Sequence, residues 1–164
     1  MKIDAHQHFW RYNERDYEWM DDTMEVLKRD YTPEDLYPQL INAGMEGTVA
    51  VQARRMIKET EYLLGLAQEY DWILAVVGWV DFSSANLEAQ LERFTAERKF
   101  VGVRELIHDM PDCEYAVSRE HLYGVGLLGK YGLTYDLLLK PQHIEPAVRL
   151  VDIYPNQPFV VDHI

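Results

Sequence analysis

The 164-residue sequence contains little cysteine, little positive charge and no long hydrophobic run. Its single cysteine, Cys113, cannot form an intramolecular disulfide, which is consistent with a reducing compartment. No apolar stretch approaches the roughly 18 residues that a membrane span needs. The N-terminus also lacks the basic, apolar and small-residue progression of a signal peptide. We therefore expect a soluble, cytoplasmic protein with no membrane partner.

The scarcity of positive charge argues against a nucleic-acid partner. The chain has 16 Lys and Arg against 28 Asp and Glu, which gives a formal net charge of −12. A surface this acidic repels a phosphate backbone. The apolar fraction of 48% is that of a globular protein, and the length is sufficient for a real core. We expect residues 1–164 to form a single domain.

Two histidines near the start of the chain are the first candidate site residues. Residues 2–5 have the pattern of a short strand, and His6 and His8 follow it two positions apart. Side chains at i and i+2 of a strand point the same way, so the two imidazoles are expected to lie side by side. Such a pair suits a divalent metal or a polarised carbonyl. Two solvated histidines at a surface strand end are the alternative.

The rest of the chain alternates between strand and helix patterns, which predicts a parallel sheet covered by helices. Strands are expected to start near residues 2, 48, 73, 100, 133 and 159, with helices near 33–43, 58–70, 86–98, 118–130 and 142–154. In the last helix, Ile144, Val148 and Val151 are expected to face the core. The glycine fingerprint of a dinucleotide fold is absent after the first strand. The aromatic stretch 11–30 is predicted to be a binding loop or a surface cover.

Polar residues follow the predicted strands: His6, His8, Gln52, Asp81, Arg104 and His163. In an eight-stranded β/α barrel the carboxyl ends of the strands hold the active site. Such a barrel normally needs about 250 residues, and the pattern here reaches six strands. We therefore predict an α/β fold of the (β/α)8 TIM-barrel type, with this chain covering about the first six strands of a truncated barrel. An open six-stranded, doubly wound sheet is the alternative.

The sequence resembles the amidohydrolase-related family. The similarity is greatest to its sugar-lactonase branch, which includes L-fuconolactonase and L-rhamnono-lactonase, while pyrone-dicarboxylate lactonases are more distant. The matching segments occur in family order over the whole chain: 4–10, 17–19, 48–53, 59–64, 76–81, 102–104, 132–137 and 159–163. Each segment is weak evidence by itself, but eight in order form a specific signal.

This resemblance implies a TIM barrel of the metal-dependent hydrolase type, with His6 and His8 at the site centre and His163 in contact with the reacting carbonyl. It also implies that Arg104 and Tyr135 lie near the substrate. The catalytic base, an Asp on the family's last strand, is expected beyond Ile164. His6 and His8 are the implied ligands of one divalent metal, zinc or manganese, although metal-independent members are also known.

The function that follows from the resemblance is hydrolysis of a sugar-acid lactone, a step of carbohydrate metabolism, by attack of water on the carbonyl. The expected partner is a small sugar lactone, and a homo-oligomer is left open. A decarboxylase, another amide or ester hydrolase on the same scaffold, and an inactive barrel fragment are the alternatives.

Several further side chains have two interpretations. Trp10, Trp19 and Trp79 could form an apolar wall for a sugar ring, although Trp79 is better explained as core. Gln52 could bind substrate or only satisfy a strand end, and Asp162 is expected to support His163 or to pair inside the barrel. The remaining histidines are interpreted as solvated or structural: His108, His121 and His143.

Overall fold

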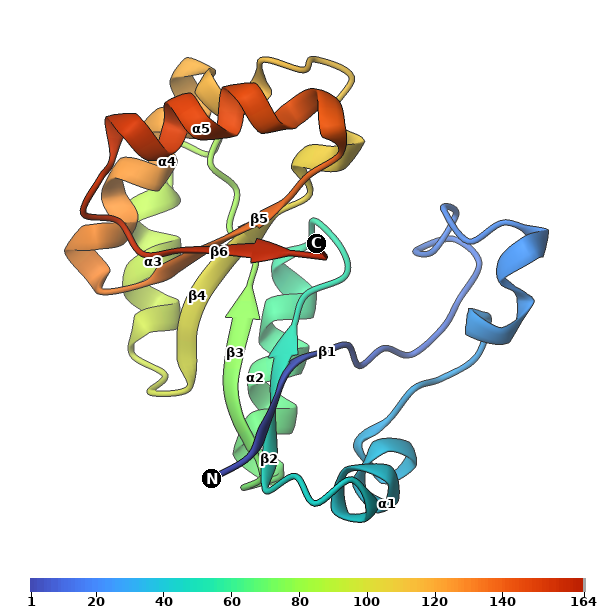
Figure 1. The fold of residues 1–164 in the computed structure, drawn as a ribbon. Coiled ribbons are helices and arrows are strands. Elements are labelled where there is room, and N and C mark those ends of the chain that lie inside the picture. The colour runs from blue at the N-terminus through green and yellow to red at the C-terminus, as the bar shows by residue number, and fades with distance from the viewer. Residues whose placement is uncertain (164) are drawn as a thin grey trace.

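The structure, a computed structural model, describes residues 1–163 and contains one sheet of six parallel strands. The strands pair in chain order, β1-β2-β3-β4-β5-β6. The sheet curls as in part of a barrel, with the helices outside it (Figure 1). The strands are β1 (Ile3–Gln7), β2 (Gly47–Val51), β3 (Ile73–Gly78), β4 (Phe100–Glu105), β5 (Thr134–Leu138) and β6 (Phe159–Asp162).

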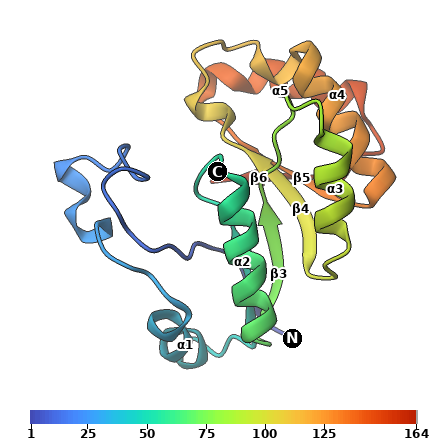
Figure 2. The same ribbon diagram turned by 180° about the vertical axis from the view of Figure 1, so that it is seen from behind.

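A helix lies between each pair of consecutive strands, as the sequence pattern predicted. Seen from behind, α2 and α3 cover the outer face of the sheet (Figure 2). The α-helices are α1 (Pro33–Asn42), α2 (Ile57–Glu69), α3 (Leu87–Thr95), α4 (Arg119–Leu128) and α5 (Ile144–Ile153). Short 3-10 helices are η1 (Asp22–Leu27), η2 (Ile107–Asp109), η3 (Tyr115–Val117), η4 (Gly129–Tyr131) and η5 (Pro141–His143). No helix within residues 1–163 is long and apolar enough to cross a membrane.

Local sequence signals account for the ends of α1. Thr32 and Asp35 form a capping box, and Pro33 occupies the first turn, where its missing N–H costs nothing. Gly44 follows the helix with a φ of +68°, a left-handed conformation that glycine adopts without strain.

The hydrophobic core lies between the sheet and its helices. Leu63 of α2, Ile73 of β3 and Leu91 of α3 are fully buried there. Tyr135 of β5 belongs to the same core and is 0% exposed. Burying one leucine or isoleucine side chain stabilises the fold by about 1.5–3 kcal/mol relative to leaving it in water.

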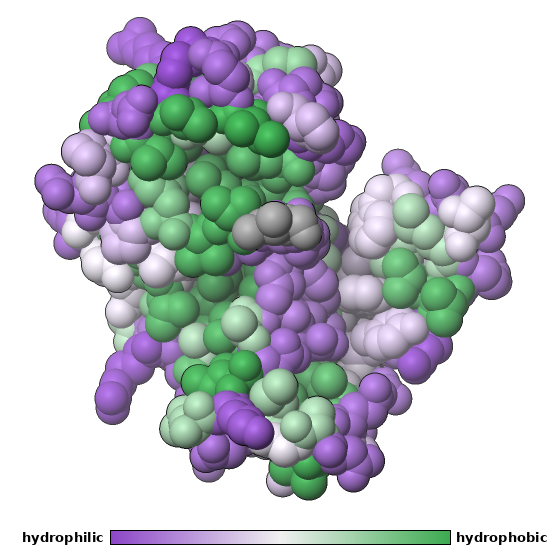
Figure 3. Space-filling view, in the orientation of Figure 1, coloured by the Kyte–Doolittle hydropathy of each residue, from purple (hydrophilic) through white to green (hydrophobic). Residues whose placement is uncertain are grey.

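The expected orientation of α5 is wrong. Ile144 and Val148 are 54% and 55% exposed, and Val151 is also exposed. The helix instead buries Ala147 and Leu150. Because α5 has apolar residues on more than one face, its sequence could not identify the face that packs on the sheet. Val160 and Val161 of β6 are exposed as well. Figure 3 shows an apolar surface, in green, over the region of α5 and β6.

The segment between β1 and α1 forms a unit outside the sheet, on the right of Figure 1. It has a small core of its own, in which Trp10, Tyr17 and Met20 are buried. Arg54, just after β2, attaches it to the sheet. Its Nη1 forms an ion pair with Oδ2 of Asp16 at 2.8 Å, and its guanidinium carbon lies 4.6 Å from the centre of the Tyr17 ring.

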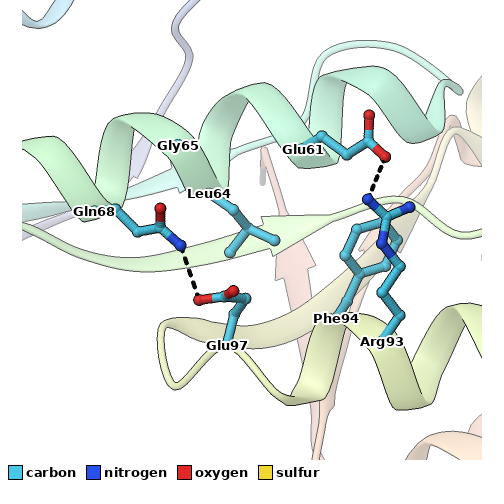
Figure 4. Close-up of a pocket in the computed structure, with 7 residues that line it drawn as sticks. All are labelled: Glu61, Leu64, Gly65, Gln68, Arg93, Phe94 and Glu97. Carbon is cyan, nitrogen blue, oxygen red and sulfur yellow. Dashed lines mark hydrogen bonds and ion pairs between the residues drawn. The ribbon is translucent and has the colours of Figure 1, made fainter.

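A hollow of about 190 Å³ separates α2 from α3 on the outer surface (Figure 4). Two contacts bridge it. Arg93 pairs with Glu61 at 2.6 Å, and the Gln68 amide donates to Glu97 at 3.0 Å. Gly65 of α2 borders the hollow and contributes no side chain to fill it.

Candidate functional site

The two N-terminal histidines meet at the carboxyl end of β1. The pairing of β1 with β2 shifts register between Asp4 and Gln7, the interval that contains His6. The Nε2 atoms of His6 and His8 lie 3.2 Å apart, and the two rings are nearly perpendicular, at 78°. The structure therefore brings the two side chains together, as the i, i+2 spacing predicted.

Each of these histidines is held through its other ring nitrogen. His8 Nδ1 lies 2.8 Å from the carbonyl oxygen of Val51, and His6 Nδ1 lies 3.3 Å from Oδ1 of Asp162. A carbonyl or carboxylate accepts only from an N–H, so the hydrogen is assigned to Nδ1 in both rings. Both Nε2 atoms then present lone pairs to the same point. This arrangement is typical of metal-binding histidines.

His163 follows β6 and completes a group of three. Its ring centre lies 4.9 Å from that of His6, and one ligand atom from each of His6, His8 and His163 falls within 4.8 Å of the others. His163 has a φ of +55°, the only positive φ of a non-glycine residue within residues 1–163. Backbone strain of this kind costs about 1–3 kcal/mol and is concentrated at functional sites.

Arg104, on β4, lies beneath the histidines and is 2% exposed. Its Nη1 donates to Oδ2 of Asp162 at 2.9 Å and lies 3.3 Å from His6 Nε2. Its Nη2 donates to the carbonyl oxygen of Gln52. Asp162 thus forms an ion pair with Arg104 inside the barrel and contacts His6. Of the two expected roles, the contacts therefore favour pairing inside the barrel over support of His163.

The environment disfavours the charged form of His8 and of His163. Burial, together with the charge of Arg104, lowers the pKa of His8 to about 3. Burial also lowers the pKa of His163. Burial alone would raise the pKa of Asp162, but the hydrogen bonds from His6 and Arg104 outweigh it and lower that pKa. The site therefore combines the neutral imidazoles of His8 and His163 with the ionised carboxylate of Asp162.

The pKa of a second carboxyl group, that of Asp136, is shifted upward, whereas the pKa of Asp162 is lowered. Burial, reinforced by the negative charge of Asp162, raises the pKa of Asp136 to about 6. Asp136 pairs in register with Arg104 across β4 and β5, so both side chains point to the concave face of the sheet.

A cavity of about 610 Å³ opens at these strand ends. His8, Arg104 and His163 line one part of it. Its apolar part comes mostly from the segment after β1, and the remaining polar part from the loops after β4 and β5. The other lining residues are Trp10, Trp19, Met24, Leu27, Ala53, Leu106, His108, Asp109, Leu138 and Lys140. The volume is in the range of small-molecule sites.

Tyr135, predicted to contact substrate, does not line this cavity. Neighbouring residues of a strand point to opposite faces, and Asp136 takes the concave face. Tyr135 therefore points to the helices, where its hydroxyl lies 3.0 Å from Nε2 of His121. The alternation in the sequence already required that only one of the two residues face inward, and the prediction overlooked this constraint.

Two other predicted contacts serve structural roles. Trp79 is buried, and its indole donates to Glu105 at 3.1 Å on the helix side of β4, which agrees with the core interpretation. Gln52 is completely buried, and its amide donates to the carbonyl oxygen of Arg104 at 2.9 Å. Because Arg104 also donates to the Gln52 carbonyl, Gln52 positions the arginine.

The remaining histidines divide into two classes. His121 and His143 are 0% exposed and structural, and the backbone N–H of Lys140 donates to His143 Nδ1 at 3.2 Å. His108, also interpreted as solvated or structural, instead lines the cavity with Asp109 and Lys140. The signal that could have found these three is position, since they lie in the loops that directly follow β4 and β5.

The geometry of the three histidines fits a divalent metal. Two nitrogen ligands at the usual 2.0–2.1 Å from one tetrahedral zinc lie roughly 3.3 Å apart. The observed 3.2 Å between His6 and His8 Nε2 agrees with this value. Two lone pairs at such a distance repel each other unless a cation or proton lies between them. In this structure Arg104 Nη1 lies 3.3 Å from His6 Nε2, so the guanidinium supplies an N–H donor to one of the two lone pairs.

Comparison with known proteins gives similarity over nearly the whole chain. Residues 3–164 match the family described as Amidohydrolase. The chain is 33% identical to an L-fucono-1,5-lactonase of Burkholderia ambifaria over 99% of its own length and 56% of that protein. It therefore spans about half the length of the curated relatives it matches.

Solved structures support the fold class. The crystal structure of an amidohydrolase from Burkholderia multivorans with bound zinc superposes with a TM-score of 0.92 at 34% identity. It covers 99% of this chain, which covers 57% of that structure. A probable 2-pyrone-4,6-dicarboxylic acid hydrolase from Acinetobacter baumannii has a TM-score of 0.75 at 18% identity, covering 99% of this chain and 58% of that structure, and shows the fold alone. The predicted barrel-type fold and the predicted resemblance are confirmed.

Proposed function

The chain belongs to the amidohydrolase family, and we propose that it acts in the hydrolysis of a sugar-acid lactone such as L-fucono- or L-rhamnono-lactone. The observation that carries this proposal is the cluster of His6, His8 and His163, of which His8 and His163 line a cavity of about 610 Å³. The similarity to L-fucono-1,5-lactonase supports the lactone as the substrate class. Because the chain spans only part of these relatives, the reaction remains a proposal about the protein.

His6, His8 and His163 are the residues that would hold a divalent metal, zinc or manganese. When bound, such an ion polarises a carbonyl oxygen and lowers the pKa of a coordinated water toward about 7. His6 and His8 suit this role because Asp162 and Val51 engage their Nδ1 hydrogens, which leaves the Nε2 lone pairs to bind the ion, with Arg104 Nη1 as the neighbour of His6 Nε2 that would have to make way.

The protein's own groups contribute binding and charge stabilisation. Trp10 and Trp19 give the cavity an aromatic wall on which the apolar face of a sugar ring can pack. Arg104 reaches the cavity and can donate a hydrogen bond to a lactone oxygen. A well-placed donor to a developing oxyanion is worth roughly 3–4 kcal/mol. Asp162 is engaged by both Arg104 and His6, so we do not assign it as the base that activates water.

The test is lactone opening by the complete wild-type protein and by its His163→Ala variant, measured as acid release at constant pH. We expect turnover by the wild type and a loss of orders of magnitude in the variant, with the fold intact by circular dichroism. Lys130→Ala, on the distant helix side, is the control. Near-normal turnover by His163→Ala would remove the role given to that residue, and a wild-type protein that opens no lactone would contradict the proposal.

The same scaffold suits a decarboxylase or another amide or ester hydrolase. Release of carbon dioxide from a carboxylated substrate, with no lactone opening, would favour the decarboxylase. Cleavage of simple esters in preference to lactones would favour the general hydrolase.

A further inference from the structure

One part of the cavity wall carries a pair of charged residues that the proposed reaction has not used. Asp109 lies in η2, just after β4, and Lys140 follows β5. Both line the cavity, and each side chain is about half exposed, at 53% and 52%. Lys140 Nζ lies 4.0 Å from Oδ1 of Asp109. The pair is therefore accessible to a ligand.

His108 fixes the position of this carboxylate. Its Nε2 lies 3.0 Å from the same Oδ1 of Asp109, and its side chain is 27% exposed. Oδ1 is thus engaged by both neighbours, while Oδ2 is in neither contact. The wall presents the N–H donors of an ammonium group beside a carboxylate acceptor.

The charges of this cavity balance. Lys140 faces Asp109, and Arg104 is paired with Asp162 at 2.9 Å. Each cation of the lining therefore has a carboxylate partner. Hydroxyl groups suit such a wall, because one hydroxyl both donates and accepts. A substrate carboxylate would instead have to lie near Asp109 without surplus positive charge, and like charges at close range are unfavourable.

We propose that Asp109 and Lys140 are specificity-determining residues that bind ring hydroxyl groups of a neutral, polyhydroxylated lactone. The aromatic wall of Trp10 and Trp19 then takes the apolar face of the ring, while this pair binds its polar edge. The inference rests on the proposed lactone hydrolysis and narrows its substrate class. It places carboxylated lactones, such as pyrone dicarboxylates, outside that class.

The test compares a lactone that carries hydroxyl groups with a lactone that carries no hydroxyl group. The substrates are L-fucono-1,5-lactone and δ-valerolactone, and the variants are Lys140→Met and Asp109→Asn. Loss of hydrogen bonds to substrate hydroxyls is expected to lower kcat/KM for the sugar lactone about tenfold or more. The value for δ-valerolactone should stay within about twofold, because that lactone has no hydroxyl to lose contact with.

Lys130→Met is the matched control. Lys130 also pairs with a carboxylate, Glu88 at 3.0 Å, and its side chain is 59% exposed, but it lies among the outer helices. This variant is expected to leave both substrates unchanged. A general structural defect in Lys140→Met would instead lower kcat/KM for both substrates equally.

Binding of the corresponding sugar lactam, measured by titration calorimetry, separates this inference from the proposed reaction. Binding by the wild type that weakens in Lys140→Met supports the inference even if no lactone is opened. Turnover with an unchanged ratio between the two lactones overturns the inference and leaves the reaction intact. A wild type that binds no lactam, or that prefers a pyrone dicarboxylate, also overturns it.

Discussion

Nδ1 of His6 lies 3.3 Å from Oδ1 of Asp162, whose other oxygen accepts a hydrogen bond from Arg104 at 2.9 Å. One carboxylate therefore orients the imidazole at the front of the site and neutralises the guanidinium beneath it. Because Asp162 lies on β6 and His6 on β1, this contact also joins strands that are not neighbours in the sheet.

Asp162→Asn should weaken zinc binding about 10–100-fold, the usual effect of removing the charge behind a metal-binding histidine. The amide keeps the shape of the side chain but loses its negative charge. Competition with a chromophoric chelator measures the affinity. The matched control is Asp152→Asn, on the exposed face of α5, which should bind zinc as the wild type does. Equal affinity in both variants would show that Asp162 does not act through His6.

Arg54→Met should release the segment between β1 and α1. Arg54 contacts Asp16, stacks on Tyr17 and pairs with Glu59, which is 1% exposed at its side chain. Loss of one partner of a buried ion pair costs about 3–5 kcal/mol, and the partial exposure of Arg54 places our expectation near 3. Limited trypsin digestion should cut the segment faster at Lys28 and Arg29.

The control for this variant is Arg93→Met. Arg93 pairs with Glu61 on the surface, and its side chain is 62% exposed, so its removal should change stability by less than about 1 kcal/mol. If Arg54→Met is digested no faster than Arg93→Met, the ion pair does not hold the segment in place.

The stability of the protein should depend on His121 below neutral pH. Burial lowers the pKa of His121 to about 3, whereas an unfolded histidine titrates near 6.5. As the pH falls below about 6.5 the unfolded chain takes up a proton that the folded protein refuses, so the free energy of unfolding decreases by about 1.4 kcal/mol per unit until about pH 3.

His121→Gln removes this titration while retaining a partner for the Tyr135 hydroxyl. Between pH 6.5 and 5 the wild type should lose about 2 kcal/mol more than the variant, measured by urea unfolding. Other titrating groups, such as Asp136, act equally in both proteins and cancel from the difference. Parallel pH profiles would show that His121 is protonated in the folded state.

Gly65→Ala should stabilise the protein by about 0.5–1 kcal/mol, because glycine inside a helix costs conformational entropy. Within the described residues nothing lies within 4 Å of the added Cβ, which would enter the hollow of Figure 4. Gly124→Ala is the contrasting case in α4, since its Cβ would meet the Phe82 ring. Thermal unfolding should therefore shift upward in the first variant and downward in the second.

The sequence was sufficient to predict the alternation of strands and helices, because caps and periodicity are local signals. Thr32 and Pro33 identified the start of α1 correctly, and Gly44 its end. The meeting of His6 and His8 could be predicted for the same reason. The packed face of α5 could not, because Ile144 and Leu150 are equally apolar and only the position of the sheet decides which is buried.

The positions of His108, Asp109 and Lys140 after two predicted strands were a usable signal, but their meeting in one cavity wall could not be predicted from the sequence. These residues come from two different loops, and nothing local relates them. Their proximity depends on the parallel pairing of β4 with β5, which brings the ends of the two strands together. Tyr135 was the opposite case, since strand alternation alone required that Tyr135 and Asp136 face opposite sides of the sheet, so that only one of them could face the cavity.

The sheet order follows the chain order, so every strand from β2 to β6 pairs with the strand made just before it. During synthesis the N-terminal part of a chain emerges first. Each new strand-helix unit of this protein therefore finds its neighbour already available. The sheet can therefore form one strand at a time from the N-terminal side, whereas the cluster of His6, His8 and His163 forms only once β6 has joined the five strands that precede it.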